Sequence, residues 1–238
     1  MIQVVVNMII HNIHFPFYGI IILLSVLIGM IYIYLNLKKN GNKSKEILYF
    51  YILYLTFALI GGKMYTLLVY YKTDVNLLTV GLSAYGGLIG VVIGSIIFEK
   101  IFYCNKNIIK YTILSLPLVY GLTKIACFIA GCCNGIPYSG IFYVIYRDGL
   151  NIKQFPIQIV ETIVFLFIFF ICNKYKDKKN INFITLLVVF IFKFLLDFLR
   201  YDHINLLLSR NQIVSILLIV ILLVIKKTNI IDKILANK

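Results

Sequence analysis

The chain has 238 residues, of which 61% are hydrophobic and only 13% are charged, and its mean hydropathy is +0.96. A soluble globular domain is about half apolar and about one quarter charged, so this composition excludes a soluble enzyme, a disordered chain and a disulfide-rich secreted domain. The formal net charge is +14, from 23 Lys and Arg against 9 Asp and Glu. In a membrane protein the meaning of such an excess depends on where the cations lie along the chain.

Seven apolar segments are long enough, or nearly so, to cross a hydrocarbon core of about 30 Å as helices. They lie at about residues 17–37, 47–71, 80–98, 111–132, 155–173, 181–199 and 212–225. Backbone groups in lipid find hydrogen-bond partners only within helices or closed barrels, so we expect an all-α, polytopic integral membrane protein. No soluble region or linker interrupts the segments, and residues 1–238 are predicted to form a single transmembrane domain.

The cations are distributed unequally between alternate connections. Fifteen Lys lie after the first, third, fifth and seventh segments, whereas the opposite connections carry only five cations. Cytoplasmic loops are enriched in Lys and Arg, so the pattern predicts an N-terminus outside and a C-terminus in the cytoplasm. The positive charge is therefore a topology signal, with some attraction to anionic lipid head groups, and no nucleic-acid partner is expected.

Five ionisable side chains lie inside the predicted spans, where such residues are costly and usually face a cavity or a partner. They are Lys63, Lys124, Glu161, Lys193 and Asp197. With the predicted topology all five lie in the outer half of the membrane. Independent extension of each side chain toward the interface is one explanation. A single shared polar cavity explains the common depth better, and we expect Tyr85 to line that cavity as well.

The sixth segment places three charged residues at helical spacing. Lys193, Asp197 and Arg200 are separated by four and three positions, so they are predicted to share one helix face. They form either an ion-pair ladder within the helix or a strip of two cations around one carboxylate that faces an anionic ligand.

The third segment, GLSAYGGLIGVVIG, is rich in glycine. Gly86, Gly90 and Gly94 recur at every fourth position, which predicts close packing against another helix. This packing does not explain Gly87 or the cluster Tyr85-Gly86-Gly87 at the outer end of the span. A glycine at that end of the span allows the backbone to approach a ligand closely.

The segment CFIAGCCNGIPYSG follows the fourth span and contains Cys127, Cys132 and Cys133. A metal site is one interpretation, but no His or Cys partner lies at a standard spacing, so small buried cysteines are favoured and no metal is expected. Gly131 and Gly135 predict a tight turn after the span.

Several short motifs occur in order along nearly the whole chain. They are Phe17-Tyr18-Gly19, Gly62-Lys63, GLSAYGGLIG, LTKIACFIAGCCNG, FPIQIVE, KFLLDFLR and the single Gln212. Together they resemble the motifs of the bacterial prolipoprotein diacylglyceryl transferases, in a Cys-rich form of that family.

The resemblance implies transfer of a diacylglyceryl group from phosphatidylglycerol to the lipobox cysteine thiol of a prolipoprotein, at the outer leaflet of the bacterial cytoplasmic membrane. The product is a thioether, glycerol phosphate leaves, and no cofactor is required. This chemistry suits the predicted cavity, because fixed cations stabilise a phosphate that gains negative charge as the C–O bond breaks. The acceptor thiol must lose its proton, so a base is also needed.

Carried onto this sequence, the motifs imply Tyr85, Lys124 and Lys193 as catalytic residues. The implied substrate-binding residues are Tyr18, Lys63, Gly86, Gly87, Cys127, Gly135, Gln158, Glu161, Asp197 and Arg200.

The chain departs from the family pattern at its cations. Lys63, Lys124 and Lys193 stand where the family usually has Arg, and Tyr85 stands where His is frequent. Lys lacks the planar fork with which Arg binds phosphate. An inactive protein of the same fold that binds anionic lipid or a partner is therefore the alternative function. A transporter would predict inverted repeats, and the sequence shows no internal symmetry.

The topology predicts that the loop from Lys38 to Lys45 is cytoplasmic. In a chain without native cysteines, Lys43→Cys should remain unlabelled by a membrane-impermeant maleimide in intact cells and become labelled after permeabilisation. Ser139→Cys, between the fourth and fifth spans, is the matched control and should be labelled in intact cells. Labelling of Lys43→Cys in intact cells would contradict the orientation.

Overall fold

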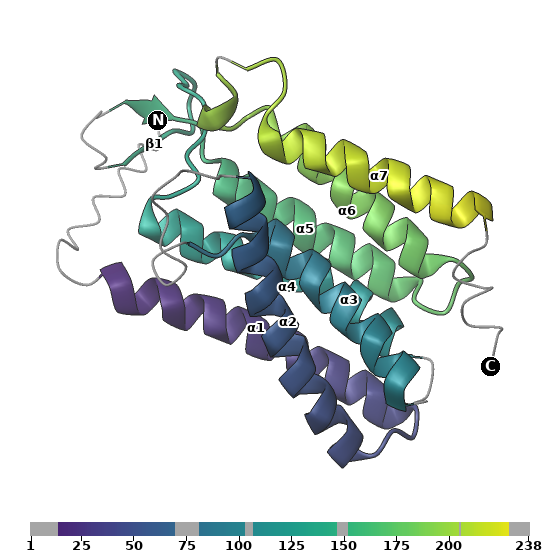
Figure 1. Cartoon of the computed structure of the whole chain (residues 1–238). Helices are drawn as coiled ribbons and strands as arrows, with labels where there is room; N and C mark the ends of the chain where they lie inside the picture. Colours follow the sequence, from purple (N-terminus) through teal and green to yellow (C-terminus); the bar gives the residue numbers. More distant parts are fainter. Residues whose placement is uncertain (1–13, 70–80, 103–106, 147–151, 205, 229–238) are drawn as a thin grey trace. The chain divides into compact units, whose positions relative to one another are not determined.

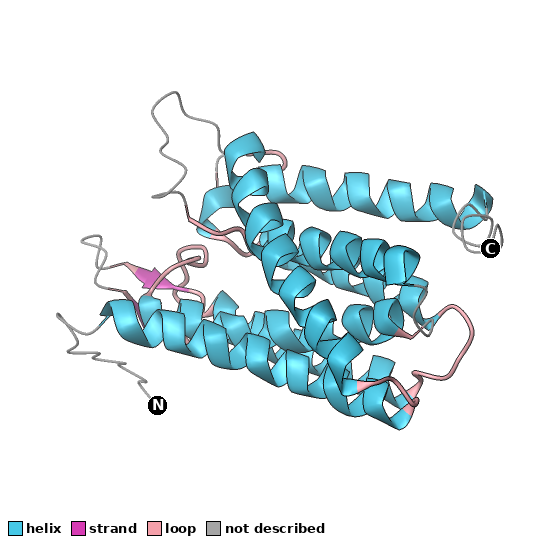
Figure 2. Cartoon of the chain, turned by 60° about the horizontal axis from the view of Figure 1, so that its bottom comes forward, coloured by secondary structure: helices cyan, strands magenta, loops and turns pink. Residues whose placement is uncertain are grey.

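The computed structural model describes residues 14–69, 81–102, 107–146, 152–204 and 206–228. Within these ranges the chain forms seven α-helices at the positions of the seven predicted spans (Figures 1 and 2). They are α1 (His14–Lys39), α2 (Ser44–Val69), α3 (Ala84–Phe102), α4 (Ile108–Ala130), α5 (Ile157–Lys174), α6 (Ile181–Asp197) and α7 (Arg210–Thr228).

The helices confirm the expected architecture of a polytopic membrane protein. Six of those in the described ranges, all except α6, are long and apolar enough to cross a bilayer. Helix α6 has 17 residues, slightly fewer than the roughly 20 that a perpendicular crossing needs. The crossing of α6 stays a prediction.

Helix α5 has one exposed face, formed by large apolar side chains, and one buried face. Ile163, Phe167 and Phe170 are between 62% and 65% exposed, whereas Glu161 and Phe165 are fully buried. Water would make this exposure of large apolar side chains unfavourable, whereas lipid tails would not. The exposed face of α5 is therefore suited to contact lipid.

The third helix differs most from its predicted bounds, 80–98. It begins later because the Ser83 carbonyl accepts the bond from the Gly87 N–H (3.0 Å), while the Ser83 N–H donates to Gly62 of α2 (3.2 Å). It ends later because Glu99 is buried rather than part of a loop. The Glu99 Oε1 accepts the N–H of Ile109 (2.9 Å) at the start of α4, where a helix favours negative charge.

The described residues divide into two compact units. One extends from Val26 to Tyr120, and the other contains the start of α1 up to Ser25 and the residues from Gly121 onward. In the first unit α2 packs against α3 through glycine. A Cβ atom on Gly86 would lie 2.1 Å from the Gly61 carbonyl oxygen, and one on Gly90 would lie 2.1 Å from that of Phe57. The predicted packing by small residues is confirmed.

In the second unit, α5, α6 and α7 lie side by side (Figure 1). The connection between α4 and α5 contains strands β1 (Val144–Ile145) and β2 (Lys153–Gln154), an antiparallel pair in which Val144 faces Gln154. These short strands are an addition to the all-α expectation. They supply hydrogen-bond partners to a connection that is too irregular to be helical.

The same connection also pairs with the chain beyond α6. Gly135 forms an antiparallel bridge with Arg200, the Ile136 N–H donates to Leu199 (3.0 Å), and the Tyr201 N–H donates to Asn134 (2.9 Å). Tyr201 begins a short 3-10 helix, η1 (Tyr201–His203). The pairing holds the turn after α4 beside the end of α6, where the charged residues of the second unit are found.

The glycine packing predicts unequal effects of two alanine substitutions on α3. Gly90→Ala should destabilise the protein by about 1–3 kcal/mol, because the new methyl group meets backbone atoms that cannot rotate away. Gly87→Ala is the matched control, because its Cβ atom would lie 3.7 Å from the nearest atom of α2, the Ala58 carbonyl oxygen, which is ordinary contact. Thermal melting in detergent measures both, and equal melting temperatures for the two variants would refute this packing.

Candidate functional site

Five charged side chains meet inside the second unit, and we call them the charged cluster. They are Lys124 on α4, Glu161 on α5, Lys193 and Asp197 on α6, and Arg200 just beyond α6. Each is at most 6% exposed, and Glu161 is fully buried. The sequence-based grouping of Lys124, Glu161, Lys193 and Asp197 is therefore present in the structure.

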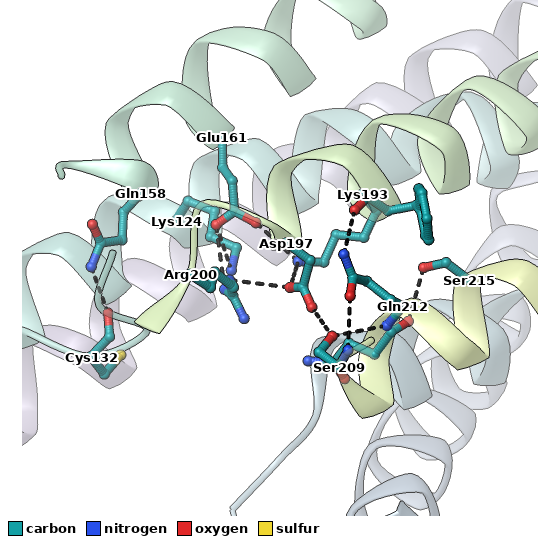
Figure 3. Close-up of polar contacts among 12 residues, drawn as sticks. Lys124, Cys132, Gln158, Glu161, Lys193, Asp197, Arg200, Ser209, Gln212 and Ser215 are labelled. Atoms are coloured by element: carbon teal, nitrogen blue, oxygen red, sulfur yellow. Dashed lines mark hydrogen bonds and ion pairs between the residues drawn. The ribbon is translucent and has the colours of Figure 1, made fainter. Parts of the chain in front are cut away.

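Glu161 is the centre of the charged cluster (Figure 3). Its Oε2 atom lies 3.0 Å from Lys124 Nζ and 3.4 Å from Arg200 Nη2. Its Oε1 atom accepts a hydrogen bond from Lys193 Nζ at 2.9 Å. One carboxylate thus contacts three cations, one from α4 and two from the end of α6 and the residues just beyond it.

Asp197 is the second carboxylate of the charged cluster. Its Oδ1 atom lies 3.7 Å from Lys193 Nζ and 3.5 Å from Arg200 Nε. The contacts expected from the spacing of four and three residues are present. The expected shared helix face is wrong for Arg200, because α6 ends at Asp197 and Arg200 has an extended backbone (φ −96°, ψ 146°). That conformation allows Arg200 to pair with Gly135.

The charged cluster contains three cations and two carboxylates, so its formal charge is positive. Burying ions costs several kcal/mol each unless good contacts compensate, and the central carboxylate supplies those contacts here. The remaining positive charge acts in a region of low dielectric, where it attracts an anion much more strongly than in water. The geometry is therefore suited to binding an anionic group and to stabilising negative charge that develops on it.

Asp197 is linked to the start of α7 through Ser209 and Gln212. The Ser209 hydroxyl donates to Asp197 Oδ2 and accepts the Gln212 N–H at 3.1 Å. The Gln212 side chain accepts the Ser209 N–H at 2.8 Å and donates to Phe194 at 3.3 Å. This is a capping box, in which the first residue and the fourth satisfy each other's backbone N–H groups. It fixes α7 and Asp197 together.

Sequence reasoning noted Gln212 only as a motif match and did not include Ser209 among the site residues. The signal was nevertheless available, because Ser-x-x-Gln before an apolar run is the pattern of a capping box. Their contribution is to orient the second carboxylate of the charged cluster.

Gln158 holds the turn after α4. Its Nε2 atom donates to the Cys132 carbonyl at 2.7 Å, and its Oε1 atom accepts the Tyr146 hydroxyl at 3.0 Å. Burial raises the pKa of Tyr146 above its ordinary value, so the hydroxyl keeps the proton that it donates. Gly135 also serves packing, because a Cβ atom there would lie 2.1 Å from the Phe155 carbonyl oxygen.

The other residues implied by the family motifs lie on α1 to α4. Tyr18 lies on α1 within the second unit and is 36% exposed. Lys63, Tyr85, Gly86 and Gly87 belong to the first unit, where Tyr85 stacks on Tyr65 with ring centroids 5.7 Å apart. A cavity shared by Lys63, Tyr85 and the charged cluster stays a prediction.

Cys127 lies in the second unit too, on the last turns of α4. Its sulfur and those of Cys132 and Cys133 lie within 4.8 Å of one another. The spacing in the sequence did not predict this grouping.

Comparison with known proteins agrees with the motifs. The family model for prolipoprotein diacylglyceryl transferase matches residues 3–226. The phosphatidylglycerol–prolipoprotein diacylglyceryl transferase of Clostridium tetani is 27% identical over 227 residues, which cover 86% of this chain and 89% of the relative. Those of Clostridium perfringens (enzyme 2) and Clostridioides difficile are each 27% identical, and the alignments cover 85% and 84% of this chain and 86% and 85% of the relatives. Because the family model spans nearly the whole sequence, this chain belongs to the prolipoprotein diacylglyceryl transferase family.

Proposed function

We propose that this protein transfers a diacylglyceryl group from phosphatidylglycerol to the lipobox cysteine thiol of a prolipoprotein. The observation that carries the proposal is the buried charged cluster, in which Lys124, Lys193 and Arg200 surround Glu161 in a member of this family. The surplus positive charge suits the anionic phosphate of the lipid.

The reaction makes one bond and breaks one. The acceptor sulfur attacks the glyceryl carbon next to the phosphate and forms a thioether C–S bond. The C–O bond to the phosphate breaks, glycerol phosphate leaves with the electron pair, and the thiol proton passes to a base. Negative charge grows on the phosphate as the C–O bond breaks, and cations held in place stabilise that charge without further reorganisation.

The geometry around Glu161 suggests how lysines can act where the family usually has arginines. Lys124 contacts Oε2 at 3.0 Å and Lys193 contacts Oε1 at 2.9 Å, so one planar carboxylate sets the positions of two ammonium groups. Two positioned ammonium groups can bind two phosphate oxygens, as the fork of one guanidinium does. Lys124 and Lys193 are the proposed phosphate-binding catalytic residues.

The remaining site assignments rest on the family motifs. Tyr85 is proposed as a third catalytic residue. Lys63, Gly86 and Gly87 are proposed to contact the lipid, together with Tyr18 on α1. Gln158 and Gly135 would act indirectly, because their observed contacts hold the turn after α4.

The proposed location is the bacterial cytoplasmic membrane, with the site facing the outer leaflet. The support is the excess of Lys in alternate connections, which favours an orientation with the N-terminus outward and the C-terminus inward. In this arrangement residues 1–238 act as one transmembrane domain, the lipid enters from the bilayer, and the prolipoprotein presents its signal peptide from the same leaflet.

The proposal predicts that this chain restores lipoprotein modification in cells depleted of their own transferase, scored by thioether lipidation of a reporter lipoprotein. Lys124→Ala should lose a charge-assisted contact of about 1.5–3 kcal/mol in binding, and more in the transition state, so transfer should fall by at least about tenfold. Lys124→Arg should retain or increase transfer, because it restores the phosphate fork.

Lys110→Ala is the matched control, since Lys110 lies on the same helix outside the charged cluster and should retain full transfer. Each variant is purified in detergent, and its melting temperature is measured so that misfolding is recognised. Full transfer by a folded Lys124→Ala variant would remove Lys124 from the site. Binding of phosphatidylglycerol by the unsubstituted chain without any transfer would favour the inactive lipid-binding alternative.

A further inference from the structure

Three cysteines lie close together where α4 ends, one on its last turns and two just beyond it. The sulfurs of Cys127, Cys132 and Cys133 lie within 4.8 Å of one another. All three are free thiols, and Cys127 is 9% exposed. Within the described part of the chain the group contains no His, carboxylate or fourth cysteine.

The end of α4 explains why residues five positions apart meet. Gly131 has a left-handed backbone (φ +66°), its N–H donates to Phe128 (3.3 Å), and the Cys132 N–H donates to Cys127 (3.0 Å). These two bonds and the left-handed glycine define a Schellman motif, which characteristically brings the side chains at the positions of Cys127 and Cys132 into contact. The helix ending itself therefore assembles two of the three thiols.

Cys133 joins them through a conformation that its residue type rarely adopts. Its φ angle is +60°, in the left-handed region that disfavours a side chain. Such strain is maintained only where the surroundings determine it, and it is concentrated at functional sites. Here the surroundings include Gln158, which holds the Cys132 carbonyl at 2.7 Å. The turn is thus fixed by contacts from α5.

We propose that Cys127, Cys132 and Cys133 form a three-thiolate site for a soft monovalent metal ion, Cu(I). Metal–thiolate bonds are about 2.3 Å long, so three sulfurs around one ion in a plane are separated by about 4 Å. The observed separations need only a small contraction to reach this arrangement. Thiolates select soft ions such as Cu(I).

The number of donors favours Cu(I) over Zn(II). Structural zinc sites almost always use four protein ligands, whereas this group offers three. Binding transfers no electrons, because the ion arrives as Cu(I) and displaces the thiol protons to solvent. The resulting complex is negatively charged. Lys124 lies three positions before Cys127 on α4, hence on the same helix face, and its charge stabilises that complex.

The inference does not depend on the transfer reaction, and metal binding is its readout. The test uses the full chain in detergent, reduced and free of oxygen, with Cys104→Ser and Cys172→Ser so that only the three thiols remain. Cu(I) is supplied in competition with the chromophoric chelator bicinchoninate. We expect one Cu(I) per chain and an X-ray absorption spectrum of three sulfur ligands.

Single substitutions test each ligand. Cys127→Ser, Cys132→Ser and Cys133→Ser should each weaken Cu(I) binding by at least about tenfold, measured with the same chelator. The chain that retains all native cysteines and the Cys172→Ser variant are the controls, and both should bind as the parent does. Cys172 lies on α5 and is not part of the group.

Three results would overturn the site. They are loss of all Cu(I) to the chelator, unchanged stoichiometry when the three cysteines are replaced together, and a spectrum dominated by nitrogen or oxygen ligands. Preference for Zn(II) over Cu(I) in direct competition would overturn the assignment to a monovalent ion. The spectrum of the unsubstituted thiols remains decisive if a serine variant fails to fold.

Discussion

The second unit is organised by the need to neutralise charge around a carboxylate that has no access to water. Glu161 lies on α5 and is fully buried, and its two oxygens contact Lys124, Lys193 and Arg200. Removing Glu161 from this arrangement would leave three buried cations against one carboxylate, which is far costlier than losing an exposed ion pair. The positions of α4, α5 and the end of α6 are therefore coupled through one side chain.

Two neighbouring features position the other members of the charged cluster. The bridge between Gly135 and Arg200 places the guanidinium at the cluster, because it draws the backbone out of the helical path beyond Asp197. The capping box of α7 directs the Ser209 hydroxyl at Asp197. Backbone pairing and helix capping thus determine where the charges lie. A preorganised set of cations of this kind stabilises charge in a transition state without a reorganisation cost.

The sequence predicted most of the helices and part of the site. Long apolar segments marked the helices, and helical spacing predicted the contacts of Asp197 with Lys193 and Arg200. Helical spacing could not predict that Glu161 contacts three cations. Its partners lie 32 to 39 positions away, and spacing reports only on neighbours within one helix. The Schellman motif was also readable, because Gly131 ends α4, but the left-handed Cys133 was not.

The central claim is that Glu161 holds three buried cations in place by partly compensating their charge, and that the remaining positive charge serves an anionic lipid. Melting of Glu161→Gln in nanodiscs of zwitterionic lipid tests it, with Glu99→Gln, another buried glutamate, as the control. The account predicts a loss of about 3–5 kcal/mol for Glu161→Gln, much more than for the control. Phosphatidylglycerol in the nanodisc should restore part of that stability, since its phosphate can bind the cations whose charge Glu161 no longer compensates. A Glu161→Gln variant as stable as the unsubstituted protein, and indifferent to phosphatidylglycerol, would contradict the account.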